Sequence, residues 1–106
     1  MIYYTITNGI IKQHQAAKID LKLLQQAVGG LIQPVYTDWS KELTIYANEE
    51  ALNLNLKPNI FINQQLIFGN LVLVSIDSKT TDHKSCSLSM QEVFDMLEQW
   101  QPVAKE

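Results

Sequence analysis

The chain has 106 residues, of which 46% are hydrophobic, and this length and composition fit one domain with a single core. Eight Lys against eleven Asp and Glu give a formal net charge of -3, and the chain contains no arginine. Because arginine is the residue that grips phosphates and guanines bidentately, we expect no nucleic-acid partner, and any phosphate should be held by lysine or backbone.

The sequence also bears on the cellular compartment. The N-terminus has no signal-peptide pattern, and no apolar run approaches the roughly 18 residues of a membrane span. Cys86 is the only cysteine and cannot form an intramolecular disulfide. We therefore expect a cytoplasmic protein that makes no contact with a membrane.

The first predicted elements form a hairpin. Residues Ile2–Thr7 alternate in the manner of a half-buried strand, and Asn8-Gly9 is a strong turn signal. The chain then returns, and we place the paired part of the second strand near Gln15–Ile19.

A helix comes next. Asp20 is a good N-cap, and Leu21, Leu24 and Val28 recur at helical spacing. Gly29-Gly30 should end the helix, since glycine adopts the left-handed conformation past the C-cap without a steric penalty.

Two strands are predicted after this helix. Leu31–Tyr36 contains Pro34, which lacks the N–H of a ladder bond, so this strand should lie at the sheet edge or at a bulge. Leu43–Ala47 alternates again and should form a second hairpin with it. The polar triplet Asn48-Glu49-Glu50 ends that strand.

The middle of the chain is harder to assign. Ala51–Pro58 alternates leucine with polar residues and receives no prediction, and Ile60–Phe68 is expected to be an irregular segment over the core. Leu71–Ile76 is the most uniformly apolar run, which predicts a strand buried on both faces in the middle of the sheet.

The last element is a helix entered through a capping box of Ser89 and Glu92, after a polar stretch over Asp77–Ser87. Its apolar stripe should cover one face of the sheet and bury both Phe94 and Trp100. The stripe consists of Met90, Val93, Phe94, Leu97 and Trp100.

These elements predict a single α+β domain over residues 1–106. Its sheet should be mixed or mostly antiparallel, with about five strands and two helices in the order β-β-α-β-β-β-α.

The sequence resembles a bacterial family catalogued only as a domain of unknown function and met largely in phages and plasmids. The shared pattern is L-x-x-L-Q-x-x-V-G-G-x-I-x-x-V, then N-E-E, P-x-N, G-x-x-x-V and S-L-S. The matching positions are Leu21, Leu24, Gln25, Val28, Gly29, Gly30, Ile32, Val35, Asn48, Glu49, Glu50, Pro58, Asn59, Gly69, Val72 or Leu73, Ser87, Leu88 and Ser89. Two positions depart from it, because the family often has an acidic residue at Gln33 and a glycine at Ala51. The resemblance implies a mobile genetic element as the genomic setting and brings no activity.

The Asn48-Glu49-Glu50 triplet is the first candidate site. Two carboxylates and an amide at a strand end could hold a cation or a ligand hydroxyl. The alternative is a plain turn, because asparagine favours turns and surface glutamates are usually solvated. Adjacent strand residues point to opposite faces, so Glu49 and Glu50 are poorly placed to act as an acid and base pair.

A small-ligand pocket, if present, should have Asn48, Glu49, Glu50 and Asn59 near its rim. Tyr36 or Tyr46 would supply one wall, since pockets combine a few fixed polar groups with apolar or aromatic walls. Without arginine, such a site favours a neutral or cationic polar ligand, or an anion held by backbone N–H groups and a lysine.

Other candidates are weaker. His83 and Cys86 lie three residues apart but lack a third orienting group and are too few for a zinc site, so we predict no catalytic residue, metal or cofactor. Aromatic residues on the first four strands could equally form a binding surface or ordinary packing.

Three functions follow from these observations. The favoured one is a small non-enzymatic accessory protein of a mobile element that binds a host protein or sequesters a small polar ligand. The first alternative is a metal- or carboxylate-dependent enzyme that uses Glu49 or Glu50. The second is a self-associating structural subunit, a homodimer that uses the Leu31–Tyr36 edge or the tyrosine-bearing face. An enzyme would need the glutamates, Asn59 and a histidine or lysine in one cleft.

Overall fold

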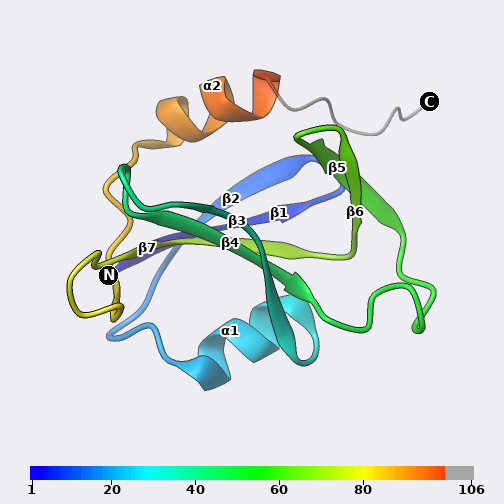
Figure 1. Ribbon diagram of the computed structural model, residues 1–106, viewed down its shortest axis with the longest axis horizontal. Helices are drawn as coiled ribbons and strands as arrows, with labels where there is room; N and C mark the ends of the chain where they lie inside the picture. Colours follow the sequence, from blue (N-terminus) through cyan, green and yellow to red (C-terminus); the bar gives the residue numbers. More distant parts are fainter. Residues whose placement is uncertain (100–106) are drawn as a thin grey trace.

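The computed structural model describes residues 1–99. A central antiparallel sheet has one helix on each side (Figure 1). The elements are β1 (Ile2–Thr7), β2 (Ile10–Gln15), α1 (Leu21–Val28), β3 (Ile32–Asp38), β4 (Leu43–Asn48), β5 (Pro58–Ile62), β6 (Gln65–Phe68), β7 (Leu71–Ile76), β8 (His83–Lys84) and α2 (Met90–Gln99). Neither helix in this part of the chain is long and apolar enough to cross a membrane.

The main sheet has the strand order β2-β1-β7-β4-β3, and the two-residue strand β8 also pairs with β7. Strands β5 and β6 form a separate two-stranded sheet, and every pairing among the described residues is antiparallel. The predicted α+β class with a mostly antiparallel sheet is confirmed. The predicted number and order of strands are not, because β5, β6 and β8 were missed.

Strand β7 is the centre of the molecule, as its apolar sequence predicts. All six of its residues are buried. Leu71 and Leu73 belong to one core cluster with residues of α2, whereas Val72 and Val74 belong to a second cluster with residues of α1. The two helices therefore cover opposite faces of the sheet, as Figure 1 shows.

Strand β2 begins directly after the Asn8-Gly9 turn, where both residues have positive φ angles of 58° and 76°. Thr7 lies opposite Ile10, so the hairpin is paired from its turn onward. The prediction that pairing lies near Gln15–Ile19 was wrong. The polar residues of β2 are compatible with a strand because β2 lies at the edge of the sheet, where alternate side chains reach solvent.

The signals at the two ends of α1 are confirmed. The carboxylate Oδ1 of Asp20 accepts a hydrogen bond from the Leu23 N–H at 3.0 Å. Gly29 has a φ of 82°, and its N–H donates to the Gln25 carbonyl at 2.8 Å. The helix therefore ends where the chain must turn back toward β3.

Strand β3 lies at the opposite edge of the sheet from β2, and its register with β4 shifts between Pro34 and Tyr36. Both the edge and the bulge agree with the prediction from proline.

The segment Ile60–Phe68 is a hairpin and not the predicted irregular segment. Its turn residues Asn63 and Gln64 have φ angles of 49° and 70°, a geometry that suits a two-residue hairpin turn. Ile60, Ile62 and Ile67 are buried in the cluster on the α2 side, so the hairpin covers that part of the core.

The capping box of α2 is present: the Ser89 N–H donates to the Glu92 carboxylate at 2.8 Å, and the Glu92 N–H donates to Ser89 Oγ at 3.2 Å. Val93 and Leu97 are buried against the sheet. The prediction that Phe94 is buried was wrong, because its side chain is 49% exposed. Successive helix residues are rotated by about 100°, so the face that buries Val93 directs Phe94 outward. Trp100 lies outside the described residues.

Candidate functional site

Asn48 ends β4 and is nearly fully buried. Its Nδ2 donates to the Val28 carbonyl at 3.2 Å, and its Oδ1 accepts from the Glu50 N–H at 2.8 Å. A Cβ atom on Gly30 would lie 2.9 Å from Asn48 Nδ2, so the amide occupies the space that the glycine leaves. Asn48 thus ties the end of β4 to the end of α1.

Asn59 joins three other segments. Its Nδ2 donates to the carbonyls of Ile6 and Gly69, both at 2.7 Å, and its Oδ1 accepts from the Gly9 N–H at 2.9 Å. The side chain is 2% exposed. Both N–H groups of the amide are occupied, so Asn59 holds the β1–β2 turn and the β6–β7 junction in place.

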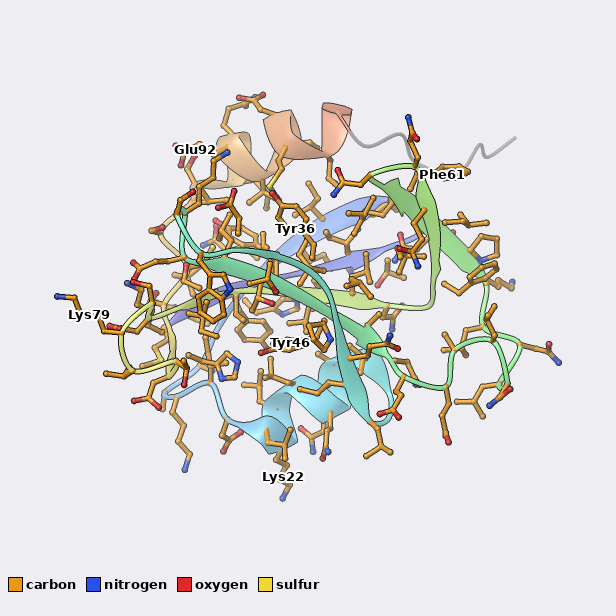
Figure 2. The ribbon with its side chains drawn as sticks, viewed as in Figure 1. Lys22, Tyr36, Tyr46, Phe61, Lys79 and Glu92 are labelled. Atoms are coloured by element: carbon orange, nitrogen blue, oxygen red, sulfur yellow. The ribbon has the colours of Figure 1, made fainter. Side chains whose placement is uncertain are left out.

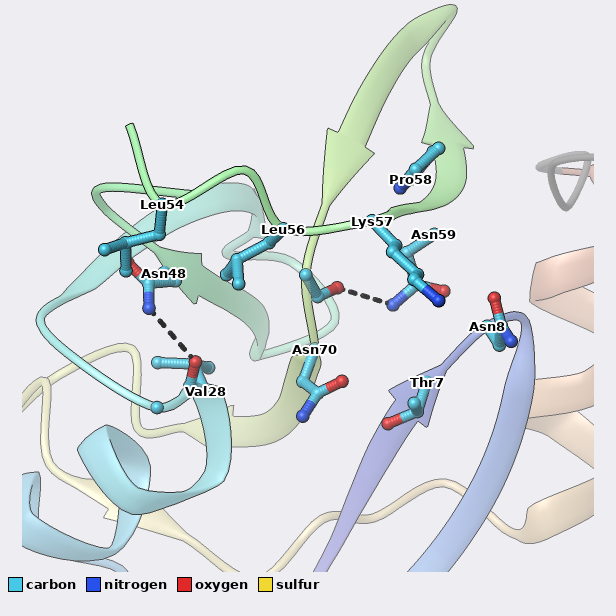
Figure 3. A pocket seen from close by; sticks show the side chains of 12 residues that line it. Thr7, Asn8, Val28, Asn48, Leu54, Leu56, Lys57, Pro58, Asn59 and Asn70 are labelled. Atoms are coloured by element: carbon cyan, nitrogen blue, oxygen red, sulfur yellow. Dashed lines mark hydrogen bonds between the residues drawn. The ribbon is translucent and has the colours of Figure 1, made fainter. Parts of the chain in front are cut away.

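A hollow of about 380 Å³ lies between these two asparagines (Figure 3). We call it the amide hollow. It is bounded by the end of β1 and the turn that follows, the ends of α1 and β4, the start of β5 with the segment before it, and the β6–β7 junction. Its lining residues are Thr7, Asn8, Val28, Gly29, Asn48, Leu54, Leu56, Lys57, Pro58, Asn59, Gly69 and Asn70.

Four polar side chains of the amide hollow are available to a ligand. Thr7, Asn8, Lys57 and Asn70 are exposed, and their side chains make no hydrogen bond or ion pair within residues 1–99. Lys57 is the one charged residue among the described residues of the lining. The frame of the hollow is therefore internally bonded, while its rim offers one cation, two amides and a hydroxyl.

Glu49 and Glu50 line a different hollow of about 350 Å³, which also borders Asn48. We call it the carboxylate hollow. Its lining residues are Gln33, Val35, Ala47, Asn48, Glu49, Glu50, Ala51, Leu52, Asn53, Gln65, Leu66, Ile67 and Phe68. The glutamates are exposed, and Asn59 is not in this lining. The four rim residues predicted from sequence are thus divided between two neighbouring hollows that share Asn48.

The two tyrosines proposed as a wall lie on opposite faces of the sheet (Figure 2). Tyr36 packs against the core cluster on the α2 side, and Tyr46 packs against the cluster on the α1 side. Neither lines the amide hollow or the carboxylate hollow. Burial raises the pKa of both phenols, so both are neutral hydrogen-bonding groups at neutral pH.

His83 and Cys86 are engaged separately. His83 Nε2 is hydrogen-bonded to the Tyr46 hydroxyl at 2.8 Å, and Cys86 is buried in the cluster on the α2 side. Burial raises the pKa of the Cys86 thiol and lowers the pKa of His83. No hydrogen bond joins His83 to Cys86 within residues 1–99, so the imidazole is not placed to take the proton of this buried thiol. Within residues 1–99, no three His, Cys, Asp or Glu side chains are grouped so that they could hold a metal ion.

A third hollow, of about 390 Å³, was not foreseen from the sequence. We call it the ring hollow, and it is lined by Tyr3, Thr5, Thr7, His14, Leu23, Gln26, Ala27 and Asn70. The rings of Tyr3 and His14 are stacked with centroids 4.9 Å apart. His14 Nε2 is hydrogen-bonded to Thr5 Oγ1 at 2.7 Å. The Asn8-Gly9 turn signal could have found this pair, because a two-residue turn that sets Thr7 opposite Ile10 also sets Tyr3 opposite His14.

No curated protein and no solved structure matched the chain. A family model described as "Domain of unknown function (DUF3846)" matches residues 2–101, and the chain belongs to this family.

Proposed function

We propose that this chain is a non-enzymatic accessory protein of a phage or plasmid that binds a small polar ligand in the amide hollow. The observation that carries the proposal is the contrast between the frame of this hollow and its rim. Asn48 and Asn59 are bonded within the protein, whereas Lys57, Asn8 and Asn70 have side chains with no partner in the described part. A fixed frame with free polar groups is the arrangement of a preformed ligand site.

The size and lining of the hollow support a small ligand. Its volume of about 380 Å³ falls within the usual range of small-molecule pockets, and its apolar residues Val28, Leu54 and Leu56 can cover the carbon skeleton of a ligand. Lys57 favours a ligand that carries a negative group. The genomic setting in a mobile element is proposed from the resemblance of the sequence motifs.

Binding is favoured over the carboxylate-dependent enzyme. An enzyme that used Glu49 or Glu50 would need a second catalytic group in the same cleft. Within residues 1–99, the carboxylate hollow is lined by no histidine or lysine, and Asn59 borders the other hollow. A host protein as the partner, and a homodimer that uses the Leu31–Tyr36 edge or the tyrosine-bearing face, stay predictions.

Native mass spectrometry tests the proposal. The wild-type protein, purified from a lysate of its bacterial host, is expected to retain a small molecule. A Lys57→Gln, Asn70→Ala double variant should lose this ligand, because it lacks the cation and one amide of the rim. Both positions are exposed, so the thermal midpoint should stay nearly unchanged.

The matched control is the Glu49→Gln, Glu50→Gln double variant, which alters the neighbouring hollow and also changes two exposed side chains. It should retain the ligand. A ligand lost only from this control would place the site in the carboxylate hollow. A wild-type protein that retains nothing, or a ligand that survives both double variants, would refute binding in the amide hollow.

A further inference from the structure

The amide hollow and the ring hollow share two lining residues, Thr7 and Asn70. The two hollows therefore adjoin at the end of β1 and can be spanned by one ligand. Tyr3, Thr5 and Thr7 alternate along β1 and lie on the same face of the sheet. With a rise of about 3.3 Å per residue, Thr5, whose Oγ1 is hydrogen-bonded to the His14 ring, and Thr7 are about 7 Å apart along the strand. A ligand that contacts both ends must be elongated.

The two ends of this combined groove differ in chemistry. Within residues 1–99, the ring hollow is lined by no Lys, Asp or Glu, and it contains the stacked Tyr3–His14 pair. The hydrogen bond between Thr5 Oγ1 and His14 Nε2 holds the imidazole in position. Leu23 of α1 adds an apolar contact to this end. Such a surface suits a flat, neutral ring, because aromatic side chains stack on the π-face of any planar ring of this kind, nucleobases included.

The middle and the far end of the groove are polar. Thr7 and Asn70 occupy the middle and offer a hydroxyl and an amide. Lys57 and Asn8 occupy the far end, where the ammonium group is the only charge in the described lining. A lysine binds a phosphate as a point charge, without the bidentate fork of arginine.

We propose that the ligand of this groove is a mononucleotide, with its base in the ring hollow, its sugar beside Thr7 and Asn70, and its phosphate at Lys57. The proposal rests on the proposed function, since it names the ligand class of the same site. The order of neutral ring, hydroxyl-bearing sugar and anion in a nucleotide matches the order of groups along the groove. The inference extends the site to His14 and Tyr3, which lie outside the amide hollow.

Isothermal titration calorimetry of the full chain tests the proposal with three kinds of probe: the four ribonucleoside monophosphates, the corresponding nucleosides, and inorganic phosphate. At least one monophosphate should bind. Its nucleoside should bind about tenfold more weakly, a factor that corresponds to about 1.4 kcal/mol, and inorganic phosphate alone should bind more weakly still.

Two variants separate the two ends of the groove. Lys57→Gln should weaken monophosphate binding about tenfold and leave nucleoside binding unchanged. His14→Gln can keep the hydrogen bond to Thr5 but removes the ring, so it should weaken monophosphate and nucleoside alike by at least about fivefold. Gln26→Ala, at an exposed position of α1 in the ring hollow, offers a second change at that end with little risk to folding. The matched control is Lys79→Gln, which removes an equal charge from an exposed lysine outside the three hollows and should change neither affinity.

Several outcomes would overturn the inference. They are a wild-type protein that binds no monophosphate, phosphate that binds as tightly as the nucleotide, and affinities that neither Lys57→Gln nor His14→Gln changes. A protein that binds no monophosphate but retains another small molecule in a Lys57-dependent manner would refute the nucleotide and leave the proposed function intact. A protein that neither binds a nucleotide nor retains a small molecule would refute both.

Discussion

Asn59→Ala is expected to lower the free energy of unfolding by about 3–5 kcal/mol. The reason is that one buried amide serves three backbone groups. The carbonyls of Ile6 and Gly69 would lose their donor, and the Gly9 N–H would lose its acceptor. Each buried group without a partner costs about 1–3 kcal/mol. Urea denaturation followed by circular dichroism measures the change.

The control for this prediction is Asn70→Ala, which removes the same amide from an exposed position with no side-chain hydrogen bond in the described part. Its effect should stay within about 0.5 kcal/mol. Asn59→Asp should also be strongly destabilising, because a carboxylate cannot donate to the two carbonyls. If Asn59→Ala costs no more than Asn70→Ala, Asn59 does not hold the three segments together.

Leu73→Ala is expected to destabilise the protein by about 2–5 kcal/mol, through lost burial and the cavity left behind. Leu73 is fully buried in the central strand, where it lies opposite Tyr4 of β1 and Ile45 of β4. Surrounding strands restrain both sides of the site, so collapse around the smaller side chain should be limited. The same urea denaturation measures the loss.

Leu52→Ala is the matched control, since it deletes the same atoms from a side chain that is 70% exposed. Its effect should be within about 0.5 kcal/mol. Equal losses at Leu73 and Leu52 would contradict the position of β7 at the centre of the sheet.

Much of this fold could be predicted because several residues determine where a helix begins or ends, or where a strand can lie, through contacts with their neighbours in the sequence. Asp20 caps the first helix through its own carboxylate, and Gly29 ends it with a positive φ. Pro34 marks an edge strand with a bulge, and Ser89 with Glu92 opens the last helix. Each signal depends on neighbours within a few residues, so it can be recognised in the sequence alone.

The elements that were missed depend on context. The turn at Asn63 and Gln64 has the positive φ angles of a hairpin turn. It lacks the glycine that usually marks such a turn in a sequence. Strand β2 contains Lys12 and Gln13, which suit a strand only at a sheet edge. Phe94 has helical spacing to other apolar residues, but the sheet contacts a narrower stripe of α2 than the pattern suggests.

The candidate site was foreseen only in part, for the same reason. Asn48 and Asn59 were selected from the sequence, but their hydrogen-bond partners are distant in the chain. The Val28 carbonyl lies 20 residues from Asn48, and the Ile6 carbonyl lies 53 residues from Asn59. Periodicity carries no information about such contacts. Lys57 gave no signal, because a single exposed lysine in a loop has no pattern around it.

The most direct test of ligand binding in the amide hollow is a two-dimensional ¹H–¹⁵N NMR spectrum of the labelled protein with and without the small molecule that it retains. The side-chain NH₂ groups of Asn8 and Asn70 report on the rim itself. We predict that these signals and the backbone amide of Lys57 shift, while the amides of Glu49 and Glu50 do not. Shifts confined to Glu49 and Glu50, or no shifts at all, would contradict the account.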